Sequence, residues 1–261
     1  MDKRVREENY EDKIIDLRRK RQEKKKKSKW KAIVFLVVIT IIAVMLSPYF
    51  KIKWFDVQGN VVVADRTIKS ATGVALGENL FSINIKKVKN NVRKIPFIKD
   101  AKIFRNLSGG IVIKVEEREK FGYIKMATGD LVIDKTGRVL DIAGKEYDYT
   151  NLVEIAGLKP GKLKPGDFIN QNYSQNIAVA VEIWDKIVKN EMDERVTSLN
   201  VKNYNNVTML IDGDKNVIVG DTYRIDYKLA MLESAIASLA PSDKGTLDIS
   251  KEGEALFSPT E

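Results

Sequence analysis

The feature that most constrains this chain is an uninterrupted apolar run near its N-terminus. From Ala32 to Phe50 the sequence reads AIVFLVVITIIAVMLSPYF, 19 residues without a charged side chain. As a helix with a rise of 1.5 Å per residue, the run would be roughly 29 Å long, close to the hydrocarbon thickness of a bilayer. Trp30 and Tyr49 flank it, and aromatic rings favour the headgroup region. Because buried core helices of this length normally have a polar face, the run predicts a membrane-spanning helix.

A cleaved signal peptide is the main alternative to an uncleaved anchor. Signal peptides have apolar stretches of about 7–15 residues, followed by a cleavage site of small residues. In this chain the run is longer, 31 residues precede it, and Pro48 stands where cleavage would be expected. We therefore expect an uncleaved signal anchor.

The charge distribution predicts the orientation of this anchor. Residues 1–31 contain 14 Lys and Arg against 7 Asp and Glu, whereas residues 51–261 contain 31 against 29. The positive-inside rule then predicts a single-pass protein of the cell membrane, with the N-terminus cytoplasmic and the C-terminus extracellular. The cluster Lys24–Lys27 suits anionic lipid headgroups of the bilayer, although a topology signal alone would also explain it. Because the net charge lies in the arm, it gives no reason to expect a nucleic-acid partner.

The sequence contains no Cys and no His. Disulfides, a thiol nucleophile and thiolate metal sites are therefore excluded, and the most common general base is missing. Asp/Glu pairs occur at Glu116-Glu117 and at Asp212 with Asp214, which are expected to be ordinary solvated positions. The segment IDGDKN (211–216) lacks the ligand spacing of a calcium loop, and no G-x-S-x-G or phosphate-loop motif is found. We expect no enzyme activity, no catalytic residue, no metal, no cofactor and no small-molecule substrate.

A β-α-α-β-β pattern is predicted directly after the apolar run. It comprises a strand in IKWFDVQG (52–59), helices over Ala64–Ala71 (with Asp65 as N-cap) and Ile85–Lys94, and a hairpin of Ile98–Arg105 and Ile111–Val115 around Ser108-Gly109-Gly110. Gly59 and Gly77 are expected to adopt turn conformations that a Cβ would strain.

A second, β-rich pattern starts at Phe121. It comprises a hairpin of Leu131–Asp134 and Arg138–Leu140, a loop with two Pro-Gly pairs (159–166), a helix over Ser174–Lys189 with an apolar stripe of Ile177, Val181, Trp184 and Val188, strands at Val196–Val201, Val207–Ile211 and Val217–Val219, a helix over Ile225–Leu239, and the closing segments GTLDIS (245–250) and EALFSP (254–259).

These segments contain motifs of a known family. The order FDVQGN, ATGVALGENLFSINI, IPFIKDAKIFRN and IVIKVEER resembles the POTRA (polypeptide-transport-associated) domain, in the version of the FtsQ/DivIB family of bacterial cell-division proteins. The later segments LVIDKTGRVLD and NVIVGD, KLAMLESAIASL, KGTLDIS resemble the second domain of that family. The resemblance covers roughly residues 30–257. The chain departs from it at Lys251, where many members have an aromatic residue.

The residue patterns and the resemblance together predict an α+β protein with a single transmembrane helix. We expect a basic cytoplasmic arm (1–31), a transmembrane signal anchor (32–50), a small POTRA-like domain (51–118), and a second mixed β-rich domain with helices packed on a sheet (119–257), followed by a tail (258–261). The resemblance implies a non-catalytic scaffold at the division septum. Its implied partners are bitopic coiled-coil division proteins (FtsB/DivIC-like and FtsL-like) and, indirectly, the septal peptidoglycan synthases.

The last strand is the predicted partner-binding edge. An edge strand offers unpaired N–H and C=O groups that an extended partner strand can complete, and the resemblance puts the partner contact on the same strand. The candidate residues are Lys251, Glu252, Glu254, Ala255, Leu256 and Phe257. Protection of the edge against aggregation would equally explain its charges, and Phe257 would then pack into its own domain.

Two other function classes share parts of this pattern. A membrane-anchored extracytoplasmic sensor or regulator would need a folded cytoplasmic module, for which 31 charged residues are too few. A secretion-associated POTRA protein of the outer membrane would need downstream barrel strands of about ten residues. The sequence favours neither.

Overall fold

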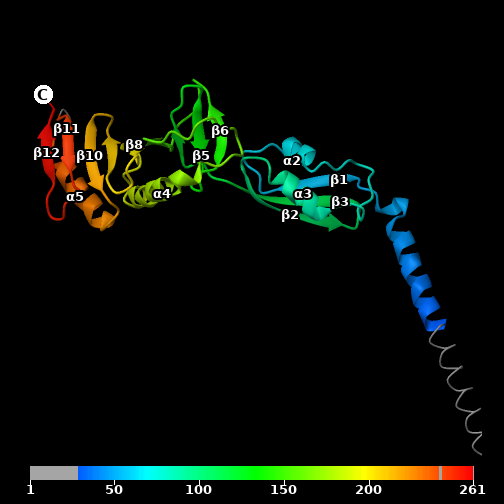
Figure 1. Cartoon of the computed structure of the whole chain (residues 1–261). Coiled ribbons are helices and arrows are strands. Elements are labelled where there is room, and N and C mark those ends of the chain that lie inside the picture. The colour runs from blue at the N-terminus through cyan, green and yellow to red at the C-terminus, as the bar shows by residue number, and fades with distance from the viewer. Residues whose placement is uncertain (1–28, 241–242, 261) are drawn as a thin grey trace, which may run out of the picture. The chain divides into compact units, whose positions relative to one another are not determined.

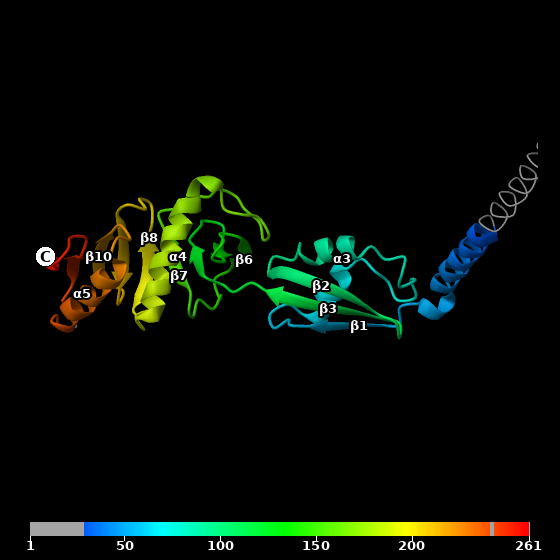
Figure 2. The ribbon, with the colours of Figure 1, turned by 90° about the horizontal axis from the view of Figure 1, so that it is seen from below.

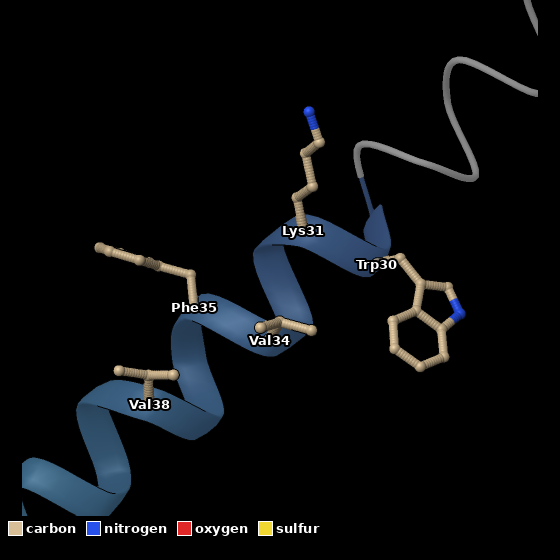
Figure 3. Close-up of a pocket in the computed structure, with 5 residues that line it drawn as sticks. All are labelled: Trp30, Lys31, Val34, Phe35 and Val38. Atoms are coloured by element: carbon tan, nitrogen blue, oxygen red, sulfur yellow. The ribbon is translucent and has the colours of Figure 1, made fainter.

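The computed structural model describes residues 29–240 and 243–260. Its first element is a helix at residues 29–45, followed by one 3-10 turn, η1 (Pro48–Phe50). The helix ends here because the residue before a proline disfavours the α conformation, and Ser47 is extended with ψ 155°. The apolar side chains of the helix project outward (Figure 3), and Trp30 and Phe35 are 70% and 67% exposed.

The predicted membrane span is not confirmed by this helix. Within residues 29–240 and 243–260, no helix is both long and apolar enough to cross a membrane. The span Ala32–Phe50 stays a prediction. Most of the predicted cytoplasmic arm, with Lys24–Lys27, lies outside the described residues.

Two compact units are distinguished by the contacts within the chain. Among the described residues, one consists of 29–56, Val74–Ile85 and Ile103–Ile113, and the other of Val57–Gly73, Lys86–Lys102 and residues 114–240 and 243–260. This division passes through the β-α-α-β-β segment. It therefore does not test the predicted boundary between residues 118 and 119, which stays a prediction.

The β-α-α-β-β order is confirmed. The elements are β1 (Trp54–Gln58), α2 (Asp65–Ala71), α3 (Ile85–Val92), β2 (Ile98–Asn106) and β3 (Gly110–Glu117), and the three strands form a sheet in the order β1-β3-β2 (Figure 1). The helices bury Ile68, Val88 and Val92, and the sheet buries Ile98, Ile111 and Ile113. Burial at every third or fourth helical residue and at alternate strand residues is the pattern of helices packed on one face of a sheet.

Local details of this segment differ from the prediction in one place and agree in another. Asp65 is not the N-cap of α2: Ala64 holds that position, and the Asp65 carboxylate instead accepts hydrogen bonds from Asn60 Nδ2 (2.9 Å) and Lys69 Nζ (3.3 Å). The glycine prediction is confirmed, since Gly59 and Gly77 have φ values of +85° and +90°. Only glycine adopts such values without strain.

The remaining strands form one large sheet. They are β4 (Gly122–Ile124), β5 (Asp130–Ile133), β6 (Val139–Ala143), β7 (Val153–Ala156), β8 (Val196–Asn200), β9 (Val207–Ile211), β10 (Lys215–Gly220), β11 (Gly245–Asp248) and β12 (Leu256–Pro259). Their order is β12-β11-β10-β9-β8-β7-β4-β5-β6. A mixed β-rich domain with helices on a sheet is thereby confirmed.

Two helices cross over this sheet. α4 (Ser174–Lys189) connects the parallel neighbours β7 and β8, and α5 (Ile225–Ala237) connects the parallel neighbours β10 and β11. Parallel neighbours require such a crossover, and its right-handedness puts both helices on the same face. Both views show α4 and α5 against one face of the sheet (Figures 1 and 2).

The core of the large sheet lies between that face and the two helices. The stripe predicted for α4 is partly wrong, because Val188 is exposed and Val181 is only half-buried, whereas Ile183 and Ile187 are fully buried. With 3.6 residues per turn, the predicted stripe runs along one border of the buried face. The centre of that face is at Ala180, Ile183 and Ile187, which are all fully buried.

The free edge of β6 is partly occupied by the loop with the two Pro-Gly pairs. Val139 N–H donates to the Asp167 carbonyl (2.9 Å), and its own carbonyl accepts from Gly166 N–H (2.8 Å). Ile169 N–H donates to the Gly137 carbonyl (2.9 Å) in the same way. The loop therefore covers the first half of the outer edge of β6.

Candidate partner-binding edge

The predicted last strand is an edge strand. β12 pairs antiparallel with β11, in a register that sets Leu247 opposite Phe257 and Asp248 opposite Leu256. No other described strand pairs with β12 on its outer side. The strand continues to Pro259, two residues beyond the predicted end of the domain at 257.

The register determines which backbone groups of β12 are free. Thr260 N–H donates to the Lys244 carbonyl at 3.0 Å, so these two residues form a hydrogen-bonded pair. Hydrogen-bonded and non-hydrogen-bonded pairs alternate along an antiparallel ladder. Leu256 and Ser258 therefore bond to β11, while Phe257 and Pro259 direct their backbone groups outward. Pro259 lacks an N–H, so Phe257 supplies the donor of the outward row within β12.

Side chains on β12 alternate between the two faces of the sheet. Phe257 is half-buried and packs against the core, with its ring next to Gly245. Leu256 points to the face without the helices and is 54% exposed. Of the two apolar residues predicted for partner contact, Leu256 is thus the accessible one, and Phe257 packs into its own domain.

The other candidate residues form the connection from β11 to β12. Lys251, Glu252, Glu254 and Ala255 are all exposed. Glu252 pairs with Arg224 at 3.0 Å, and the Arg224 guanidinium lies 4.8 Å from the centroid of the Tyr227 ring. This contact brings the N-terminus of α5 next to the connection. Arg224 and Tyr227 were not predicted from the sequence, although the string TYRIDY (222–227) at the start of the helix is rich in the residue types that dominate interfaces.

A second carboxylate fixes the start of the connection. The hydroxyl and the backbone N–H of Ser250 hold the pKa of Asp248 below its ordinary value. The Ser250 N–H donates to Asp248 Oδ1 at 2.9 Å. Asp248 thus stays ionised and holds the chain where it leaves β11.

The acidic pairs noted in the sequence have structural partners. Asp212 forms a bidentate pair with Arg195, which lowers the pKa of Asp212, and Glu116 pairs with Lys99 at 2.6 Å. The prediction of an ordinary solvated position is wrong for Glu117, whose carboxylate accepts the N–H groups of Val61, Val62 and Val63 at 2.8–3.0 Å. In the part of the chain that the structure describes, no cluster of three or more acidic residues could hold a metal.

Two hollows lie away from the edge. One is formed by Trp30, Val34, Phe35 and Val38 on the bare surface of the first helix, with Lys31 as its charged residue (Figure 3). The other lies beside Tyr123 and Tyr149, where burial and a hydrogen bond to Asp130 (2.8 Å) raise the pKa of Tyr149 to about 12. A phenol with that pKa remains protonated at neutral pH and cannot act as a base.

Comparison with known proteins gives matches over most of the chain. Residues 50–118 match the POTRA domain, FtsQ-type. The cell division protein DivIB of Clostridium botulinum (strain Hall) is 27% identical over 226 residues, which cover 86% of this chain and 88% of that protein. DivIB of Clostridium acetobutylicum is 28% identical over 236 residues (85% and 88%). The cell division protein FtsQ of Corynebacterium glutamicum is 29% identical over 135 residues (50% and 60%).

Proposed function

We propose that this chain, a homologue of the DivIB and FtsQ cell-division proteins, is a non-catalytic scaffold of the bacterial division septum. The similarity to those proteins over most of the chain supports a role in cell division. The scaffold role and the location at the septum are parts of the proposal. The single observation that carries it is the free edge of β12, which can accept a strand from another protein.

The proposed partners are bitopic division proteins with coiled-coil stems. An extended segment of such a protein would pair with β12 and gain several backbone hydrogen bonds, each worth about 0.5–1.5 kcal/mol net. Leu256 and the residues from Lys251 to Ala255 would supply side-chain specificity. Through these partners the chain would act indirectly on the septal peptidoglycan synthases.

The proposed scaffold is anchored in the cell membrane by the apolar run, with the folded part outside. We expect protease added to intact protoplasts to remove the folded part and leave a small membrane-bound stub. This outcome follows from the +7 arm ahead of an uncharged segment. Protection of the full chain, under conditions that digest a known external protein, would show that the orientation is wrong.

Localisation in dividing cells tests the septal assignment. A fluorescent protein fused to the N-terminus is expected to concentrate at mid-cell, and depletion of the chain is expected to produce filaments or incomplete septa. A fusion distributed evenly around the envelope, with normal septa after depletion, would remove the proposal.

A further inference from the structure

Two leucines are exposed on turns that lie far apart in the sequence. Leu76, between α2 and α3, and Leu107, in the turn from β2 to β3, are each 63% exposed. An exposed leucine side chain does not gain the favourable free energy that its burial would give. A scattered exposed leucine is ordinary, but both of these turns contact the same short segment of the chain.

That segment is Lys51–Lys53, which follows the apolar run directly. On one side, Gly77 N–H donates to the Ile52 carbonyl and Ile52 N–H donates to the Glu78 carbonyl, both at 2.8 Å. On the other side, Lys53 N–H donates to the Gly109 carbonyl, also at 2.8 Å. The chain is therefore held between the turn with Leu76 and the turn with Leu107.

The end of the first helix is tied to the same turns. Asn79 Nδ2 donates to the Met45 carbonyl (2.9 Å), and Leu80 N–H donates to the Phe50 carbonyl (2.8 Å). The rings of Phe50 and Phe81 meet edge to face with centroids 5.1 Å apart. All of these residues belong to one compact unit with the helix. The leucine turns are thus fixed at the helix end by direct contacts.

The residues around this point have the composition of a membrane interface. Tyr49 is 74% exposed, and the Lys53 ammonium lies 5.9 Å from the centroid of its ring. Exposed Lys51 adds a second positive charge, whereas the nearby Glu78 carboxylate accepts the Ala75 N–H at 2.8 Å. Aromatic rings and lysines gather where a chain leaves the hydrocarbon, and leucines favour the layer just beneath the headgroups.

We propose that Tyr49, Lys51, Lys53, Leu76 and Leu107 form a juxtamembrane collar that inserts into the headgroup region of the bilayer. This inference rests on the proposed anchoring, and goes beyond it by giving the folded part its own contact with lipid. The collar begins at Tyr49, within the last residues of the apolar run. The bilayer that holds the run is therefore the surface that the collar would contact. With two leucine turns beside the helix, the unit has three points of attachment and cannot turn freely about the helix axis.

The absence of cysteine from the sequence makes a direct test possible. Single-cysteine variants Leu76→Cys and Leu107→Cys of the full chain are labelled with an environment-sensitive fluorophore. They are then reconstituted in vesicles of phosphatidylcholine and phosphatidylglycerol, with or without lipids brominated near the headgroup. Both labels are expected to shift to shorter wavelength and to be quenched about twofold or more, since interfacial side chains reach about 5–10 Å into the boundary.

Two matched variants serve as controls. Val61→Cys places the label on a turn residue that is 92% exposed but lies beyond β1, whose five residues span roughly 17 Å. Its label is expected to show no quenching. Val38→Cys places the label in the middle of the apolar run, where lipids brominated deeper in the acyl chains are expected to quench it.

The outcomes separate the collar from the anchoring. If the Val38 label is quenched but the labels at positions 76 and 107 behave like that at 61, the collar is wrong and the anchoring stands. If the Val38 label is not quenched either, the anchoring fails and the collar with it. If the leucine labels become shielded only when a coiled-coil division protein is added, the surface binds protein rather than lipid, which also overturns the inference.

Discussion

A Leu256→Asp variant is expected to lose tenfold or more of its affinity for a coiled-coil division partner while its melting temperature stays unchanged. Leu256 is 54% exposed on the free edge strand and makes no core contact that the change would remove. The introduced carboxylate would lie on the open face of the sheet, beside the side chains of the added strand, where it would replace an apolar contact. An apolar contact at the centre of an interface commonly carries this much free energy. Surface-immobilised partner and a thermal melt of the same preparation measure both quantities.

A contrasting variant makes this test specific. Phe257→Ala is expected to lower the free energy of unfolding by about 1–2 kcal/mol, because the half-buried ring packs on the core beside Gly245. Val188→Asp, at an apolar position on α4 that is 46% exposed, is the matched control and should leave the affinity unchanged. Unaltered affinity in the Leu256→Asp variant would place the partner site away from β12.

A Gly59→Ala variant is expected to be destabilised by about 2–5 kcal/mol. Two effects add: a residue with a Cβ is strained by about 1–2 kcal/mol at φ +85°, and the new methyl group would collide with the Val115 carbonyl of β3. Neither effect can relax easily, because β3 is the central strand of its sheet. Thermal unfolding of the detergent-solubilised chain, followed by circular dichroism, measures the loss.

Gly77→Ala isolates the backbone strain from the collision. Gly77 has a similar φ of +90°, but no atom lies within 4 Å of where its Cβ would be. It should therefore lose only the strain, about 1–2 kcal/mol. Equal losses in the two variants would mean that the contact with Val115 costs nothing.

The sequence predicted most elements because their periodicity and turn residues agree. α4 was predicted with its observed bounds, and the helix after Arg224 ends at Ala237, two residues before the predicted Leu239. The motif resemblance to the FtsQ/DivIB family, with its POTRA domain, is confirmed by the comparisons. What local pattern could not give was the strand order, since the position of β4 between β7 and β5 depends on contacts distant in sequence.

Charged residues inside the core also escaped prediction. Lys228 is 2% exposed in α5, and its ammonium donates to the carbonyl and carboxylate of Asp221 at 2.9 Å each. Lys215 likewise begins β10 as a buried residue, two positions before the predicted start. A lysine on an apolar face is ordinarily assigned to solvent. Only the turn that brings Asp221 back over the helix explains the burial of Lys228.

For the candidate site, the sequence predicted the edge but not the faces of its residues. The period of two in a strand makes Leu256 and Phe257 point to opposite sides, yet which one meets the core depends on the register with β11. A shift of one residue would have exchanged their roles.

The loop that pairs with β6 has a consequence for how many partners the sheet can accept. With the N–H and C=O of Val139 already used, strand addition at that end would meet occupied groups over the first half of β6. At the opposite end Pro259 terminates the row of donors. A sheet that could grow at both edges would polymerise into fibres. If β12 is the partner-binding edge, as proposed, each copy of this chain would take a single strand there, and the assembly would stop.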